Sequence, residues 1–195
     1  RLMRIAVVGA GAIGGAIGGS LAQAGHDVLL VARGAHLAAI RGRGLLLDDV
    51  PVPVTATDDV RGHDPVEAVI LAVKAHQQAA AGPLVAPLLG PGTPIVAAQN
   101  GIPWWYFHAH GGPHDGRRIE SVDPGGAVSA ALPPERALGL IAYMGSHVPE
   151  PGAVVMRPEA GLVLGEPDGS DSARLRAVVD ALDSAGLEPR TRPDL

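Results

Sequence analysis

The chain has 195 residues, 47% of them hydrophobic, and a formal net charge of −5 at pH 7. This length suits one domain with a sizeable core, and the acidic balance without a basic run argues against a nucleic-acid partner. No apolar run approaches the roughly 20 residues of a membrane span, and the N-terminus lacks a signal-peptide layout. We therefore expect a soluble, cytoplasmic protein that does not enter membranes. The absence of Cys excludes disulfides and thiolate metal sites.

The N-terminal part of the sequence alternates buried strands with helices. Apolar residues recur at helical spacing in the helices and run continuously in the strands. In chain order, the predicted elements are a strand at 4–8, a helix carrying Ile13, Ile17 and Leu21 that ends at Gly25, a strand at 27–32, a short helix at 35–41, and edge strands within 45–57, where Pro51 and Pro53 suit sheet edges.

The rest of the sequence continues this alternation around one long interruption. In chain order, the predicted elements are a strand at 66–73, helical material at 76–89 with Pro83 as the first residue of a second piece, a strand at 95–99, a loop at 102–134, strands at 138–143, 154–157 and 162–164, a helix carrying Leu175, Val178, Val179 and Leu182 that ends at Gly186, and a strand at 188–191. The pattern predicts a single α/β domain over 1–195, with a Rossmann-type, doubly wound and mostly parallel sheet.

A glycine-rich motif lies directly between the first predicted strand and helix. It matches the pattern GxGxxG, in which the first glycine permits a tight turn, the second lets the backbone approach a pyrophosphate, and the third lets helix and strand pack closely. The N-terminus of the helix would offer N–H groups to the phosphates. The alternative is a plain turn in a chain rich in Ala and Gly. We predict that a dinucleotide is bound by Gly9, Ala10, Gly11, Ala12, Ile13 and Gly14.

The residue that follows the second predicted strand bears on the choice of cofactor. An acid at this position would accept a hydrogen bond from the ribose 2′-hydroxyl of NAD, whereas an arginine can hold the 2′-phosphate of NADP. The strand ends in Arg33, about 20 residues beyond the glycines, with no acid. This favours NADP(H), the alternative being an ordinary surface arginine. Arg41 and Arg43 are further cations that the sequence does not place.

Two more polar residues follow predicted strands. Lys74, the only lysine of the chain, comes after the strand at 66–73, and Asn100 follows the strand at 95–99. Ligands of open α/β sheets bind outside the carboxyl ends of the strands, so we expect both residues to face the crevice of the glycine motif and Arg33. Lys74 would contact cofactor hydroxyls or a substrate carboxylate, and Asn100 the nicotinamide end or the substrate carbonyl. The alternatives are a loop lysine and an Asn-Gly turn.

The predicted loop at 102–134 contains histidines and aromatic residues. A metal site is one hypothesis for the histidines His108, His110 and His114. No carboxylate pattern accompanies them, so we expect no metal. The aromatic run 104–107 is more typical of a covered core edge or partner surface than of a substrate-stacking platform.

Taken together, these motifs resemble the ketopantoate reductase (2-dehydropantoate 2-reductase) family. The resemblance runs through four segments in order and spacing, namely 4–31, Ala32 to Leu37, Leu71 to Gln77, and Gln99 to Ile102. It implies that the glycines bind the pyrophosphate, that Arg33 binds the 2′-phosphate, and that Lys74 and Asn100 lie near the nicotinamide and the substrate. It also implies reduction of 2-dehydropantoate, or a similar 2-oxo acid, to the 2-hydroxy acid with NADPH, within pantothenate biosynthesis.

Members of that family carry a C-terminal helical domain that supplies a general-acid lysine, and we expect this truncated chain to lack it. No residue here can then be named as the catalytic lysine, and we expect the chain alone to bind NADPH but be inactive or nearly so. An exposed apolar edge where that domain would pack favours a homodimer. Two alternatives stay open: a stand-alone NADP-binding sensor or regulatory module without catalysis, and the cofactor half of another hydroxyacid dehydrogenase.

Overall fold

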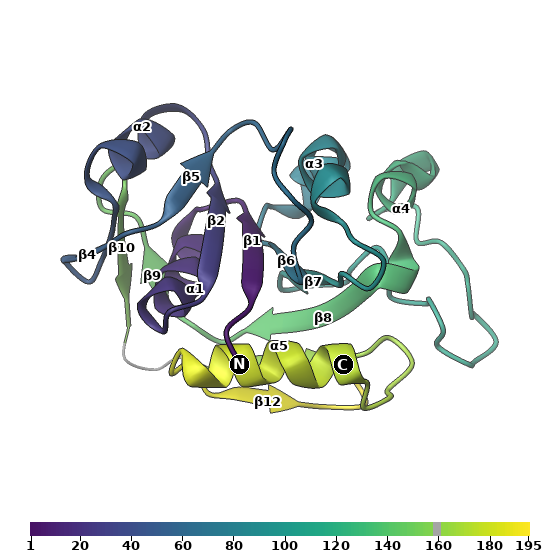
Figure 1. Cartoon of the computed structure of the whole chain (residues 1–195). Coiled ribbons are helices and arrows are strands. Elements are labelled where there is room, and N and C mark those ends of the chain that lie inside the picture. Colours follow the sequence, from purple (N-terminus) through teal and green to yellow (C-terminus); the bar gives the residue numbers. More distant parts are fainter. Residues whose placement is uncertain (158–160) are drawn as a thin grey trace.

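The chain folds into two sheets with helices packed against them (Figure 1). The computed structural model describes residues 1–157 and 161–195. The strands are β1 Arg4–Val8, β2 Asp27–Val31, β3 Leu45–Leu47, β4 Val50–Val52, β5 Thr55–Thr57, β6 Ala68–Leu71, β7 Ile95–Ala98, β8 Ala137–Ala142, β9 Ser146–His147, β10 Ala153–Met156, β11 Leu162–Gly165 and β12 Pro189–Thr191. The helices are α1 Ala12–Gln23, α2 Gly34–Arg43, α3 Gln78–Val85, α4 Ala127–Ala131 and α5 Ala173–Ser184, with 3₁₀ turns at Ala75–Gln77, Ala86–Leu88, Pro124–Gly126 and Pro134–Arg136.

The larger sheet has eight strands in the order β12-β11-β8-β7-β6-β1-β2-β5. The strands from β5 to β8 are all parallel, whereas β11 runs antiparallel to β8 and β12 runs parallel to β11. The chain starts at β1, moves outward through β2 to β5, and then returns to the other side of β1 as β6. The strand order therefore reverses between β1 and β6, which is where α/β sheets of this type bind ligands.

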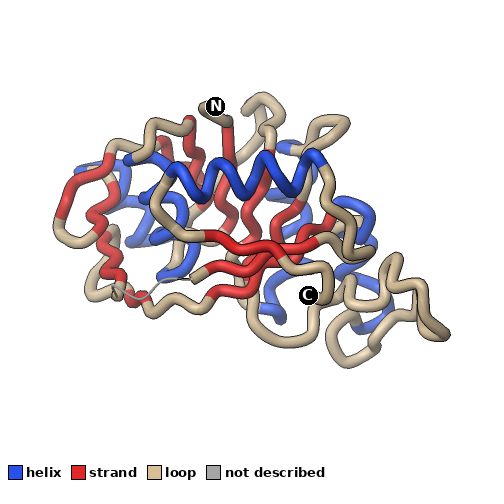
Figure 2. Tube along the Cα trace, turned by 90° about the horizontal axis from the view of Figure 1, so that it is seen from below, coloured by secondary structure: helices blue, strands red, loops and turns tan. Residues whose placement is uncertain are grey.

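Both faces of the larger sheet are covered, because the side chains of each strand alternate between two cores. In β1, Ile5 and Val7 belong to the core that also contains residues of α1, α5 and the smaller sheet. Ala6 and Val8 belong to the opposite core, with residues of α3, the Trp104–Trp105 pair and the α4 region. Figure 2 shows α5 lying across the strands on its face of the sheet. Burial on both faces explains why the central strands are continuous apolar runs.

The smaller sheet, in the order β4-β3-β10-β9, was not predicted. It closes over α1, which is thereby buried between the two sheets. An added Cβ at Gly18 would lie 2.6 Å from a Leu30 methyl of the larger sheet, and one at Gly15 would lie 2.7 Å from a Val154 methyl of the smaller. The small residues of α1 thus let both sheets approach one helix. The prediction of edge strands within 45–57 is confirmed for β4 and β5, each at the edge of its sheet.

The sequence prediction for Pro83 was wrong. Pro83 does not open a second helical piece but lies inside α3, and the break comes at the 3₁₀ turn Ala86–Leu88. α3 packs closely on α4 at this point, since an added Cβ at Gly82 would lie only 2.7 Å from the Cβ of Ala131. This packing keeps the segment helical. Tertiary contact outweighs the local cost of proline.

The predicted loop at 102–134 contains the helix α4. Its first turn is held by the fully buried carboxylate of Asp123, which accepts hydrogen bonds from the N–H of Val128 (2.7 Å) and the hydroxyl of Ser129 (2.6 Å). A helix of five residues is too short to produce a periodic pattern, so no helical signal could be read there. Within the described ranges, no helix combines the length and hydropathy needed to cross a bilayer.

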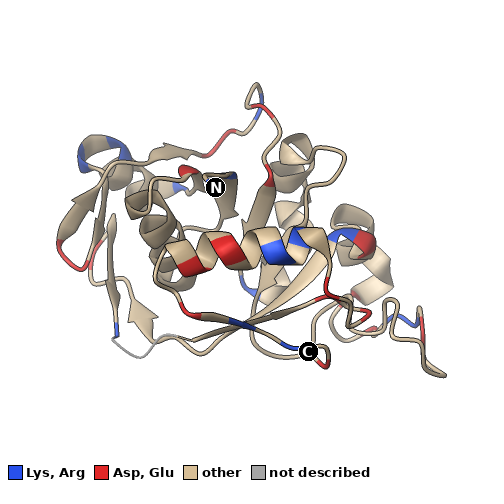
Figure 3. Ribbon diagram, turned by 60° about the horizontal axis from the view of Figure 1, so that its bottom comes forward, with Lys and Arg blue, Asp and Glu red and all other residues tan. Residues whose placement is uncertain are grey.

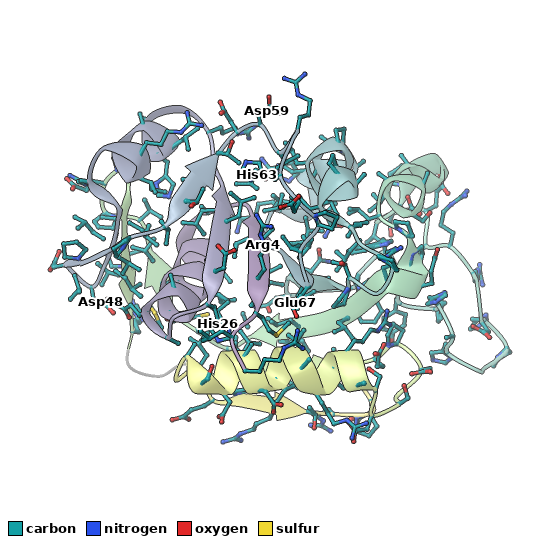
Figure 4. The ribbon with its side chains drawn as sticks, in the orientation of Figure 1. Arg4, His26, Asp48, Asp59, His63 and Glu67 are labelled. Atoms are coloured by element: carbon teal, nitrogen blue, oxygen red, sulfur yellow. The ribbon has the colours of Figure 1, made fainter. Side chains whose placement is uncertain are left out.

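A buried histidine joins the start of β2 to the end of α5 (Figure 4). His26 accepts a hydrogen bond at Nδ1 from the N–H of Met3 (3.1 Å), and its Nε2 lies 3.0 Å from the hydroxyl oxygen of Ser184. Because Nδ1 is an acceptor, the neutral ring carries its proton on Nε2 and donates it to Ser184. Burial lowers the pKa of His26 from its ordinary value, so the neutral ring is the form that the fold stabilises.

We predict that the free energy of unfolding falls as the pH drops through about 6.5, because the unfolded chain then binds a proton that folded His26 resists. In urea titrations from pH 7.5 to 5, His26→Gln should cost about 1–3 kcal/mol at pH 7.5 and should flatten this dependence. The exposed His147 offers a matched control for the substitution itself, since His147→Gln should change the stability at pH 7.5 by less than about 0.5 kcal/mol. Equal slopes for wild type and His26→Gln would contradict the assignment.

Candidate functional site

A cleft of about 670 Å³ lies at the carboxyl ends of the central strands. Segments that are far apart in the sequence meet in its wall because their parallel strands end at the same edge of the sheet. The lining residues are Val8–Gly11 after β1, Val31–Arg33 after β2, Asp58 after β5, Ala72–Lys74 after β6, His36 of α2, and His76, Gln77, Ala80, Ala81 and Leu84 around α3. The cleft coincides with the reversal of strand order between β1 and β6.

The glycine motif forms the turn from β1 into α1, and each glycine has a separate steric reason. Gly9 has a φ of +99°, and an added Cβ would lie 2.8 Å from a Val73 methyl. At Gly14 an added Cβ would meet the Gly9 carbonyl oxygen and would lie 2.9 Å from the Cβ of Ala72. At Gly11, by contrast, no atom of the described chain comes within 4 Å of that position. Gly9 and Gly14 therefore permit the turn and the packing, whereas Gly11 leaves cleft space open.

The motif contributes unequally to the cleft wall. Gly9, Ala10 and Gly11 line the cleft, whereas Ala12, Ile13 and Gly14 do not. The latter three are the first residues of α1, so their backbone N–H groups have no partner within the helix. A helix start of this kind, with its positive dipole end, attracts anions.

Arg33 and Lys74 provide two cations to the cleft wall. Arg33 occupies the N-cap position of α2. Its backbone is extended, with φ −145° and ψ 165°, and its side chain is exposed. Lys74 is also exposed and starts the 3₁₀ turn after β6, where its backbone N–H donates to Oε1 of Gln77 (3.2 Å). Within the described ranges, neither cation is paired with a carboxylate. Both are therefore free to contact an anionic ligand.

The structure does not bring Asn100 into the wall of this cleft. It follows β7 as expected, but its side-chain amide binds the end of β8: Nδ2 donates to the Ala142 carbonyl and Oδ1 accepts from the Ala142 N–H, both at 3.2 Å. Both hydrogen-bonding groups of the amide thus tie β7 to β8. Its role toward a ligand stays a prediction.

Three titratable cleft residues were missed by the sequence reasoning: His36, Asp58 and His76. Asp58 could have been found, since it directly follows the edge strand β5, whose carboxyl end lies at the same edge of the sheet. His36 accepts the N–H of Gly152 at Nδ1 (2.9 Å), and its buried Nε2 has no partner in the described part of the chain. The neutral ring therefore carries a donor without an acceptor.

The two arginines in the last turn of α2 have different neighbours. Arg41 turns toward β5, where Nε donates to the Ala56 carbonyl and Nη2 donates to Oδ1 of Asp58, both at 3.2 Å. Arg43 turns toward the loop before β10 and donates to Oε1 of Glu150 at 2.6 Å and to the Pro151 carbonyl at 2.8 Å. Arg41 is thus linked to the cleft through Asp58, and Arg43 is not.

The aromatic run has a structural role. Trp104 and Trp105 are buried in the core beneath α3, and Nε1 of Trp104 donates to the Leu132 carbonyl at 2.9 Å. The prediction of a covered core edge is confirmed for these two residues. His110 and His114 pack against the ring of Phe107, at centroid distances of 5.6 and 5.4 Å. In the part of the chain that the structure describes, no three metal-ligating side chains come together.

The parallel sheet, its reversal of strand order and the glycine turn at that reversal define an α/β protein of the Rossmann class. The family can also be stated. Residues 5–104, just over half of the chain, match the model of the family Ketopantoate reductase PanE/ApbA. The chain belongs to this family, which confirms the resemblance inferred from the sequence.

Individual relatives agree with this assignment. The chain is 41% identical over 198 residues to the 2-dehydropantoate 2-reductase of Mesorhizobium japonicum, covering 99% of this chain and 61% of the relative. It is 30% identical over 190 residues to that of Pyrococcus abyssi, covering 95% and 55%. The crystal structure of a Ralstonia solanacearum protein assigned as a ketopantoate reductase superposes with a TM-score of 0.93 at 39% identity, covering 99% and 61%. The chain thus spans between 55% and 61% of the length of these three relatives.

We predict unequal effects of alanine on stability at two glycines of the turn. Gly14→Ala should lower the free energy of unfolding by about 3 kcal/mol, because the new methyl meets the Gly9 carbonyl and the Cβ of Ala72. Gly11→Ala should leave it within about 0.5 kcal/mol of wild type, because the site is open and its φ of −72° suits alanine. Thermal and urea unfolding measure both effects. Equal loss in the two variants would disprove this division of roles.

Proposed function

We propose that this chain is the NADP(H)-binding part of an oxidoreductase that reduces 2-dehydropantoate, or a similar 2-oxo acid, to the 2-hydroxy acid. The observation that carries the proposal is the convergence of the glycine turn, Arg33 and Lys74 on one cleft at the strand reversal. The 2-dehydropantoate 2-reductase activity named for the Mesorhizobium relative supports the choice of reaction. Homodimer formation and a cytoplasmic location stay predictions.

The residues of the cleft fit a phosphorylated dinucleotide. The open space at Gly11 and the unpartnered N–H groups at the start of α1 suit the pyrophosphate, since a side chain at Gly11 would fill that space. The Arg33 guanidinium, at the end of β2, suits the 2′-phosphate because its fork can bind two phosphate oxygens.

When bound, NADP(H) supplies the hydride, and the residues of this chain bind and orient the reactants. Lys74 follows β6 at the strand reversal, so its ammonium group is the cation placed for a ribose hydroxyl or a substrate carboxylate. Asn100 would act from the end of the neighbouring strand β7. Its amide is fixed on Ala142, so we propose that it supports the shape of the nicotinamide end.

The cofactor assignment predicts a preference that depends on Arg33. In fluorescence titrations, NADPH should bind more tightly than NADH. Arg33→Ala should weaken NADPH binding about 10- to 100-fold, the effect of losing a charge-assisted contact, and should leave NADH binding nearly unchanged.

The control for this titration is Gly11→Ala, whose methyl should weaken both nucleotides alike, because each carries the pyrophosphate. If neither nucleotide binds the folded wild-type chain, or if NADH binds as tightly as NADPH, the NADP(H) assignment is wrong.

We also expect the 195-residue chain by itself to turn over little ketopantoate. Reduction of a ketone needs a proton donor for the developing alkoxide, which typically contributes about 10²- to 10⁴-fold in rate. Lys74 is the only lysine, and it comes from the cofactor-binding strand β6. Oxidation of NADPH in the presence of ketopantoate, followed at 340 nm, tests this. Turnover at the rate of a full-length relative would contradict this expectation.

A further inference from the structure

The one carboxylate among the described residues that line the cleft belongs to Asp58, and it lies beside the cation proposed for the 2′-phosphate. In the register of β2 and β5, Val31 is paired with Thr57, and the N–H of Ala32 donates to the Thr57 carbonyl at 2.9 Å. Beyond this pair, Asp58 follows β5 level with Ala32, and Arg33 is the residue after Ala32. The backbone pairing thus places an acid within one residue of the level of the arginine that is expected to select NADP(H), and both residues line the cleft.

An acid at this position works against a 2′-phosphate. A carboxylate at the end of β2 is the feature that selects NAD, because it accepts a hydrogen bond from the 2′-hydroxyl and repels a phosphate there. Asp58 comes from the neighbouring strand but lines the same cleft, so its negative charge acts on the same group of the ligand. Without compensation, Asp58 would offset part of the benefit of Arg33.

Arg41 supplies the compensation from outside the cleft wall. Its guanidinium is held at two points on β5, by the Ala56 carbonyl through Nε and by Oδ1 of Asp58 through Nη2, both at 3.2 Å. The carbonyl contact fixes the guanidinium against the strand, so its charge stays beside the carboxylate. Figure 3 shows the basic positions of α2 and the acidic segment that follows β5.

We infer that Arg41 is a positioning residue for cofactor choice: by holding and neutralising Asp58, it allows Arg33 to favour the 2′-phosphate. This inference rests on the proposed function, since it concerns the adenosine end of the same cleft. The side chains of Arg41 and Asp58 are 52% and 57% exposed, so solvent screens the pair. The effect on binding should therefore be moderate, about three- to tenfold.

The chain offers a matched control for the test. Arg43 lies in the same last turn of α2 and is also ion-paired, but its partner is Glu150, which does not line the cleft. The dissociation constants of NADPH and NADH should be measured for wild type, Arg41→Ala, Arg43→Ala, Asp58→Asn and the double variant Arg41→Ala/Asp58→Asn. Thermal unfolding of each variant checks that it is folded.

We expect Arg41→Ala to weaken NADPH binding three- to tenfold while NADH binding is unchanged or tighter, because the freed carboxylate accepts from the 2′-hydroxyl. Asp58→Asn should restore NADPH binding in the double variant, and Arg43→Ala should change neither nucleotide. A merely structural role of Arg41 would weaken both nucleotides together.

The inference is overturned if Arg41→Ala affects both nucleotides alike, or if Asp58→Asn fails to rescue the double variant. Failure of the proposed function looks different: wild type itself would then show no preference for NADPH, and Arg33→Ala would have no selective effect.

Discussion

The site depends on one close contact, the approach of α1 to the ends of β1 and β6 at the glycine turn. The backbone at Gly14 lies against the Gly9 carbonyl and Ala72 at a separation that excludes even a methyl group. This contact fixes the first turn of α1 at the reversal of strand order. The residues that lead into that turn, Gly9, Ala10 and Gly11, then line the same cleft as the residues that follow β2, β5 and β6. The cleft is a consequence of this packing and needs no separate device.

Charge is distributed in the cleft by the same topology. Parallel strands deliver Arg33, Asp58 and Lys74 to one edge, although 41 positions separate the first from the last in the sequence. The topology brings residues to this edge whatever their charge, so an acid lies together with two cations. In our proposal, the pairing of Asp58 with Arg41 lets a residue outside the cleft wall offset the charge inside it. Cofactor choice would then be a property of the β2–β5 edge and α2 together, rather than of one arginine.

The sequence revealed the parts of the fold that are encoded locally. Continuous apolar strands, the glycine turn, and Arg33 and Lys74 at strand ends could all be read because their signals lie within a few residues. The smaller sheet could not, because it pairs residues more than 100 positions apart, such as Leu46 with Ala153. Asp58 was not predicted for a similar reason, since its position in the cleft depends on the pairing of β5 with β2. The amide of Asn100 is bound to Ala142, 42 positions away, so its geometry lies beyond any local pattern.

The composition of α1 has a consequence for how this protein folds. Four of its twelve residues are the glycines Gly14, Gly15, Gly18 and Gly19, which cost roughly 4 kcal/mol of helix propensity relative to alanine. As a free peptide this helix would not persist. It is stabilised only when Leu30 of the larger sheet and Val154 of the smaller sheet close on it from opposite sides. The glycine turn therefore cannot be an early, autonomous unit, and it should form only when a segment from far along the chain completes the smaller sheet.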